Sequence, residues 1–180
     1  MEVSTPSTDT PISPQLLADR LQVGPVPLTI KASSAQTGGA YCLAEAVIVP
    51  HLLSPPHVHA AEDQLVYVLE GTIGARTGDE ELLCPAGSAV YRPCGVPHAL
   101  WNPTDEPARL LELTTPGTVE TYFRRAHELT EAGAATPEAL RELAGEHGIT
   151  PVPEWIDDLS ARHGVSLTGA VPEAAGGDTR

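Results

Sequence analysis

The sequence has few basic side chains, and this shortage excludes two classes of partner. Its 180 residues include one lysine and nine arginines against 24 acidic residues, which gives a net charge of −14. A protein of this charge is repelled by the phosphate backbone of nucleic acids and by anionic membrane surfaces. We therefore expect neither a nucleic-acid partner nor a membrane partner.

Cysteines and long apolar runs are also scarce. The three cysteines, Cys42, Cys84 and Cys94, are odd in number and far apart, which argues against a disulfide framework. No run approaches the roughly 18 apolar residues of a spanning helix. Residues 1–14 lack the basic and apolar regions of a signal peptide. These features predict a cytoplasmic protein with reduced thiols.

What the sequence does contain is enough apolar material for one domain with a β-rich centre. Apolar residues make up 41% of the chain. Between residues 27 and 116, short runs rich in Val, Leu and Thr alternate with clusters of Gly, Pro, Asn and Asp. Such regularly spaced short strands, with no helical segment between them, are typical of an antiparallel sandwich or barrel.

The flanking segments have a different character. Residues 1–26 read as a tail followed by a short helix over 13–21, with Ser13 as its cap. Residues 117–166 carry helical patterns, and Thr136 followed by a proline marks the start of one helix. Residues 167–180 read as a loose tail.

The first candidate site lies behind two prolines at the start of a predicted strand. His57 and His59 are two residues apart, so in a strand both side chains face the same side. Gln64 follows five residues later and can face the same cavity if the intervening residues make a turn. Taken alone, the pair of histidines is read equally well as two residues of a surface loop.

A third histidine follows about forty residues later. Pro93 and Gly95 predict a tight turn, and His98 starts the next strand. If the sheets close on each other, the three imidazoles can meet. Three nitrogen ligands with an open face suit Fe, Ni, Cu, Zn or Mn.

The two segments together resemble the conserved motifs of the cupin family. The first motif, G-x5-H-x-H-x(3,4)-E-x6-G, and the second, G-x5-P-x-G-x2-H-x3-N, are matched by His57, His59, Gln64 and Gly71, and by Gly87, Pro93, Gly95, His98 and Asn102. The resemblance implies an all-β cupin fold, a double-stranded β-helix or jelly-roll barrel with C-terminal helices. The chain looks most similar to small single-domain cupins related to bacterial quercetin dioxygenases, and this implies a homodimer.

The chain departs from the family pattern at two positions. His51 stands where the first motif begins with glycine, and Gln64 stands at the position of the glutamate ligand. An amide oxygen can coordinate a metal, but it brings no charge, so we expect weaker binding of divalent ions than in a site with a carboxylate. Gln64 is then either a weak ligand or a hydrogen-bonding group.

Further candidates lie in the predicted strands. Glu45 and Glu112 sit in apolar runs, where an inward carboxylate would have a raised pKa and serve as an acid or base. The alternative is that each points to solvent beside an arginine. Candidate substrate-binding residues are Tyr41, Val66, Val68, Tyr91 and Leu100, and ordinary packing is the alternative for each.

Three functions remain open at this point. The resemblance favours a metal-dependent oxygenase acting on a small aromatic or enolisable molecule, with one divalent ion (Fe, Ni or Mn, with Zn as an alternative). His57, His59 and His98 would be its ligands, with Gln64 as the fourth. A non-oxidative cyclase, isomerase or lyase of secondary metabolism is the second possibility, and a non-catalytic small-molecule-binding cupin is the third.

Overall fold

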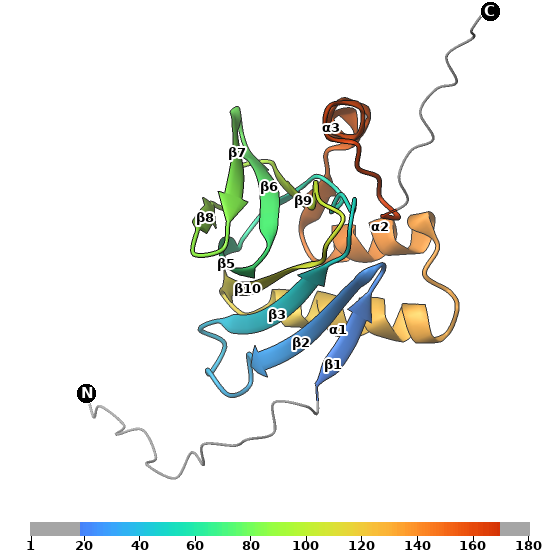
Figure 1. The fold of residues 1–180 in the computed structure, drawn as a ribbon. Helices are drawn as coiled ribbons and strands as arrows, with labels where there is room; N and C mark the ends of the chain where they lie inside the picture. The colour runs from blue at the N-terminus through green and yellow to red at the C-terminus, as the bar shows by residue number, and fades with distance from the viewer. Residues whose placement is uncertain (1–18, 170–180) are drawn as a thin grey trace, which may run out of the picture.

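Two antiparallel sheets form the framework of the molecule. The structure is a computed structural model that describes residues 19–169, shown in Figure 1. In the order in which they pair, the strands of the first sheet are β1 (Arg20–Val23), β2 (Val26–Ala32), β3 (Cys42–Ile48), β10 (Ala108–Thr115), β5 (Asp63–Glu70) and β8 (Ala89–Arg92). Those of the second are β11 (Ile149–Pro151), β4 (His57–His59), β9 (His98–Trp101), β6 (Thr72–Thr77) and β7 (Glu80–Pro85).

Strand alternation decides which side chains face the space between the sheets. On β3, buried and partly exposed residues alternate along the whole strand. Ala44 on β3 lies opposite Glu112 on β10, which lies opposite Val66 on β5. These three residues therefore share the inner face, where Val66 joins the main apolar core with Ile73 and Leu100. The predicted all-β core is confirmed as two facing antiparallel sheets.

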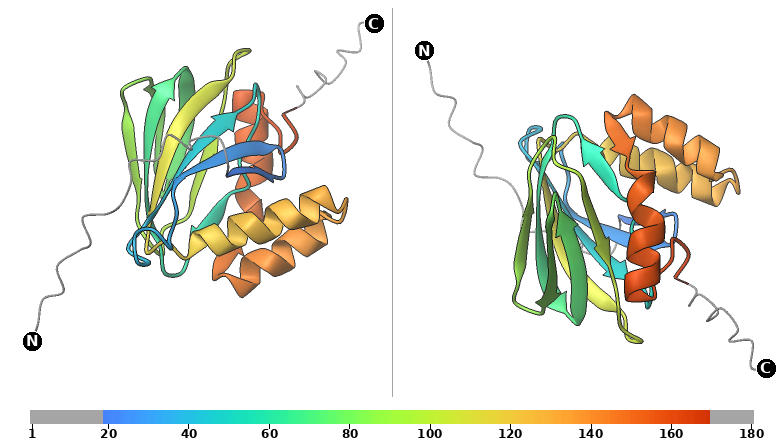
Figure 2. Two further views of the ribbon diagram at one scale, coloured as in Figure 1. Left: turned by 90° about the horizontal axis from the view of Figure 1, so that it is seen from below. Right: turned by 90° about the horizontal axis from the view of Figure 1, so that it is seen from above.

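The helices follow β10, as the sequence indicates, with the short strand β11 between α2 and η1. They are α1 (Val119–Glu131), α2 (Pro137–Glu146), the short 3-10 helix η1 (Pro153–Trp155) and α3 (Ile156–His163). The Thr136 side chain accepts a hydrogen bond from the Ala139 backbone N–H, as expected of a cap. Figure 2 shows α1 and α2 side by side, apart from α3. Within residues 19–169, no helix is both long and apolar enough to span a membrane.

The N-terminal part of the described chain differs from the sequence prediction. The predicted helix over 13–21 lies mostly outside the described residues, but its last two residues, Arg20 and Leu21, belong to β1. This strand pairs with β2, so the first sheet begins before residue 27. Leu21 is buried in the core, which explains why the strand is favoured there.

Strand β9 is buried on both faces and joins the sandwich to α3. Leu100 packs in the core between the sheets, while Ala99 and Trp101 form a second apolar cluster with Leu159 of α3. The ring of His163 stacks on Trp101 with 4.5 Å between ring centroids. Helix α3 therefore holds β9 in place from the side opposite the interior.

Gly74 on β6 tests this packing. A Cβ atom added there would lie 2.0 Å from the indole of Trp101, which is fully buried. We expect Gly74→Ala to lower the free energy of unfolding by about 3 kcal/mol, because the indole has to move in a filled core. Urea unfolding measures this change.

Gly145 provides the matched control. It lies in α2, where an added Cβ would meet nothing within 4 Å. Gly145→Ala should leave stability equal or raise it by up to about 1 kcal/mol through helix propensity. Equal effects of the two substitutions would contradict the packing described here.

Candidate metal centre

Three histidines converge from two paired strands of the second sheet. His57 and His59 belong to β4, and His57 lies directly opposite His98 on β9. The Nε2 atom of His57 is 3.2 Å from Nε2 of His59 and 3.2 Å from Nε2 of His98. One nitrogen from each ring falls within 4.8 Å of the others. The predicted trio is thus brought together.

The backbone around each histidine fixes the direction of its ring. His57 Nδ1 lies 2.6 Å from the carbonyl oxygen of Pro55, and His98 Nδ1 lies 3.0 Å from that of Val96. Gly95, in the turn before β9, adopts a positive φ of 75° that few other residues tolerate. Its N–H donates to the carbonyl of His59, which joins this turn to β4.

These contacts also fix where the protons sit. A carbonyl or carboxylate oxygen only accepts hydrogen bonds, so each Nδ1 must carry the hydrogen. Burial lowers the pKa of His57 to about 4 and that of His98 to about 2, and it lowers the pKa of His59 as well. All three rings are therefore neutral near pH 7, and each Nε2 presents a lone pair to the other two.

A divalent cation bound between the rings would remove this repulsion. Three lone pairs at such short distances repel one another, because none of the Nε2 atoms has a hydrogen to donate. Two nitrogens bound to one ion at about 2.1 Å lie about 3.0 to 3.4 Å apart at octahedral to tetrahedral angles. The observed 3.2 Å spacings match this range. The three histidines therefore fit a divalent metal ion.

Sequence reasoning missed the group that orients His59. Glu62 is buried, and its Oε2 atom lies 3.3 Å from Nδ1 of His59. Its other oxygen accepts a hydrogen bond of 2.5 Å from the hydroxyl of Thr118, which precedes α1. A carboxylate behind a histidine ligand fixes the ring and raises its basicity. The spacing of three residues after His59 was the available signal.

A polar row on the first sheet faces the interior. Gln64 on β5 lies opposite Arg92 on β8 and Thr114 on β10, so these three side chains share a face. Glu112, two residues before Thr114, shares it too, and its carboxylate accepts hydrogen bonds from Gln64 at 3.1 Å and Arg92 at 2.7 Å. The charge of Glu112 opposes the fall in pKa that burial causes in His57 and His59.

Only some of the predicted substrate-binding residues face the interior between the two sheets. Val66, Val68 and Leu100 are buried in the core between the sheets. Tyr91 is 57% exposed and lies opposite Leu65 on the outer face, and Tyr41 is also exposed. Tyr91 does not line the interior, because its neighbour Arg92 is the residue that points inward. Tyr41 precedes β3 and is exposed.

Glu45 also lies outside the site, contrary to its prediction as a catalytic residue. It is opposite Leu111 on β10, on the outer face of the first sheet. Its carboxylate forms ion pairs with Lys31 at 2.8 Å and Arg109 at 2.9 Å. The hydrogen bond from Lys31 is the main cause that lowers the pKa of Glu45, the opposite of the rise expected of an acid catalyst.

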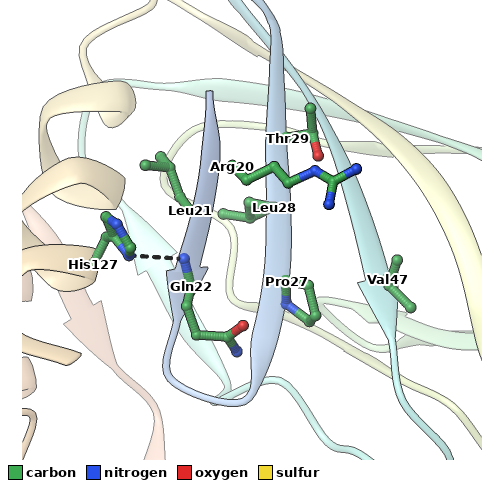
Figure 3. A pocket seen from close by; sticks show the side chains of 8 residues that line it. All are labelled: Arg20, Leu21, Gln22, Pro27, Leu28, Thr29, Val47 and His127. Atoms are coloured by element: carbon green, nitrogen blue, oxygen red, sulfur yellow. Dashed lines mark hydrogen bonds between the residues drawn. The ribbon is translucent and has the colours of Figure 1, made fainter. Parts of the chain in front are cut away.

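A hollow of about 410 Å³ lies elsewhere, over β1 and β2. Figure 3 shows its lining, in which His127 comes from α1 and Arg20 from β1. Nδ1 of His127 accepts a hydrogen bond from the backbone N–H of Gln22, so this ring serves the packing of α1 on the sheet. None of the lining residues is acidic, and we assign the hollow no role.

A family model matches the part of the chain that carries the three histidines. The family model described as "Cupin domain" matches residues 44–114, which include the three histidines, Gln64 and Glu112. The chain thus contains a domain of the cupin superfamily, and its two sheets with C-terminal helices form the corresponding sandwich. No curated protein matched the sequence.

Several solved structures are similar to part of this chain. TT1209 from Thermus thermophilus is 34% identical, with 44% of this chain and 75% of that chain covered and a TM-score of 0.43. KdgF from Halomonas sp. is 19% identical, with 55% and 88% covered and a TM-score of 0.50. A predicted oxalate decarboxylase from Thermotoga maritima is 20% identical, with 51% and 80% covered and a TM-score of 0.48.

Removing one histidine tests the metal centre. We expect His98→Ala to abolish stoichiometric binding of Ni²⁺ or Co²⁺, because two imidazoles remain where three converge. The ions should raise the melting temperature of the unaltered protein and not that of the variant. His51→Asn, a change outside the cluster, is the control. Full metal content in His98→Ala would refute the three-histidine centre.

Removing the carboxylate behind His59 tests its orienting role. We expect Glu62→Gln to weaken Ni²⁺ binding by about tenfold or more, as such outer partners usually do. Thr118→Val, which removes the hydroxyl that holds Glu62, should have a smaller effect in the same direction. Calorimetric titration measures both, and Glu128→Gln on the exposed face of α1 is the control. Unchanged affinity in Glu62→Gln would show that Glu62 only packs.

Proposed function

We propose that the chain is a metal-dependent enzyme that oxygenates a small aromatic or enolisable molecule. The observation that carries the metal dependence is the set of three Nε2 lone pairs directed at one point, with two separations of 3.2 Å. The resemblance to quercetin dioxygenase-related cupins supports the choice of reaction. The ion, Fe, Ni or Mn rather than Zn, would supply a Lewis acid and an electron path between substrate and dioxygen.

The charges around the centre favour an anionic substrate. His57, His59 and His98 are neutral, so the buried carboxylate of Glu62 behind His59 offsets only one of the two charges of a divalent ion. On the facing wall, the guanidinium of Arg92 and the carboxylate of Glu112 form an ion pair at 2.7 Å and largely offset each other. A substrate oxygen that binds as an enolate or phenolate would supply the missing negative charge.

The apolar part of the interior supports a substrate with a hydrophobic body. Val66 and Val68 are fully buried, and Leu100 packs against the same cluster. Val66 and Val68 share the inner face of β5 with Gln64, so a substrate ring on this side of the centre would meet an apolar wall. Binding sites for small molecules commonly combine such walls with a few placed polar groups.

A non-oxidative reaction is the second candidate, and Glu112 favours it. Its carboxylate is on the inner face of the first sheet, where it can take a proton from a substrate carbon. A redox-inert ion such as Zn²⁺ would suffice for such an isomerisation, cyclisation or elimination.

The homodimer and the cytoplasmic location implied earlier stay predictions.

Oxygen consumption separates the candidates. We expect protein loaded with Fe²⁺, Ni²⁺ or Mn²⁺ to consume dioxygen with a flavonol or a 1,3-diketone, and protein loaded with Zn²⁺ to consume none. An oxygen electrode and product mass spectrometry measure the reaction, with His98→Ala as the inactive control. If the substrate is converted without oxygen uptake, and Zn²⁺ also supports the conversion, the non-oxidative reaction is the function and oxygenation is refuted. Saturable binding without conversion would support the binding protein instead.

A further inference from the structure

The amide of Gln64 is held in a single orientation by its neighbours. Its Nε2 donates to Oε1 of Glu112 at 3.1 Å and lies 3.4 Å from the hydroxyl of Thr114. If the amide were turned over, its oxygen would face the Glu112 carboxylate, and two acceptors would repel each other. Glu112 therefore decides that the nitrogen points toward β10.

The amide oxygen is left without a hydrogen bond. Gln64 is only 3% exposed, and among residues 19–169 its Oε1 has no hydrogen-bond partner. Leaving a buried acceptor unpaired costs about 1–3 kcal/mol, so a partner is expected. The side chain lies on the inner face of the first sheet, across the interior from the histidines. A cation at the three imidazoles would provide that partner.

Arg92 fixes the carboxylate that orients the amide. Its guanidinium is 3% exposed and donates to Oε2 of Glu112, while Gln64 donates to Oε1. Each carboxylate oxygen is thus engaged by one donor, and the rotamer of Glu112 is set from both sides. The result is a chain of contacts from Arg92 through Glu112 to the amide.

We propose that Glu112 is a positioning residue that turns the Gln64 oxygen toward the metal ion and strengthens it as a ligand. This inference rests on the metal centre of the proposed function. An amide whose N–H donates to a carboxylate carries more negative charge on its oxygen, since hydrogen bonds in series polarise one another. In this chain two residues then share the role of the family's glutamate ligand: Gln64 on β5 is the neutral ligand, and Glu112 on β10 carries the charge.

Metal affinity of the full chain tests the proposal, with Co²⁺ as the probe. We expect Glu112→Gln to raise the Co²⁺ dissociation constant about tenfold or more, the usual effect of losing an outer partner. The visible absorption spectrum of the bound Co²⁺ should also change in this variant. A purely structural role of Glu112 would leave that spectrum unaltered. Glu45→Gln, which removes another carboxylate paired with an arginine but on the outer face of the first sheet, should alter neither. Unfolding of the metal-free proteins controls for folding.

Two further backgrounds separate the route of the effect. Arg92→Met removes the guanidinium that Glu112→Gln leaves unpaired, and the affinity loss from Glu112→Gln should persist in that background. Gln64→Leu removes the amide, and in that background Glu112→Gln should change the Co²⁺ affinity less than twofold. A loss of the same size with and without the amide would overturn the proposal, as would an unchanged affinity in Glu112→Gln alone.

Exchanging the two side chains gives an independent check. The double variant Gln64→Glu/Glu112→Gln restores a charged ligand on β5 and keeps an amide beside it. It should bind Co²⁺ at least as tightly as the unaltered protein, and binding as weak as that of Glu112→Gln would contradict this shared role. If the unaltered protein oxygenates a substrate but the Glu112→Gln variant binds Co²⁺ normally, this inference fails and the proposed function stands.

Discussion

The repulsion among three imidazole lone pairs is the constraint on which the rest of the structure depends. His57, His59 and His98 are each locked into the same tautomer by an acceptor behind the ring: two backbone carbonyls and the carboxylate of Glu62. None can turn away without losing that hydrogen bond, and the rings of His59 and His98 are buried. The packing of the sandwich therefore has to hold the three lone pairs in an arrangement that a divalent cation would relieve.

The fold supplies that support by placing the histidines on paired strands in the middle of a sheet. β4 and β9 each have a neighbour on either side, so neither is an edge strand. The turn at Gly95 is tied to β4 through the carbonyl of His59. Rigid elements of this kind hold ligands more accurately than loops do. The first sheet then faces the centre with side chains whose positions are set by register.

The sequence predicts the pair of histidines on β4 well, because the face they share does not depend on the register of strand pairing. Two residues apart on a strand means one face, and Pro93 with Gly95 marks the turn before His98. Glu45 and Glu112, in contrast, both appeared as carboxylates in apolar strands. Only the pairing distinguishes them: Glu45 lies opposite Leu111 on the outer face, and Glu112 lies opposite Ala44 and Val66 on the inner face.

Irregular strand pairing makes it hard to predict which residues of a strand face inward. The ladder between β10 and β5 shifts between Arg109 and Leu110, and that between β2 and β3 shifts between Ile30 and Ala32. A bulge of one residue exchanges the inner and outer sets. Tyr91 was misplaced for the related reason that an aromatic residue suits either face. Glu62 was missed because its contact with His59 depends on a turn whose shape the sequence does not specify.

The burial of β9 on both faces couples two regions that have separate tasks. Its residues alternate between the interior, with His98 and Leu100, and the apolar cluster under α3, with Ala99 and Trp101, so the strand has no side free to absorb a change. A substitution beneath α3 that shifts Trp101 by a fraction of an ångström must also shift the backbone that carries His98. The C-terminal helix, remote from any substrate, thereby becomes a place from which the ligand geometry can be adjusted.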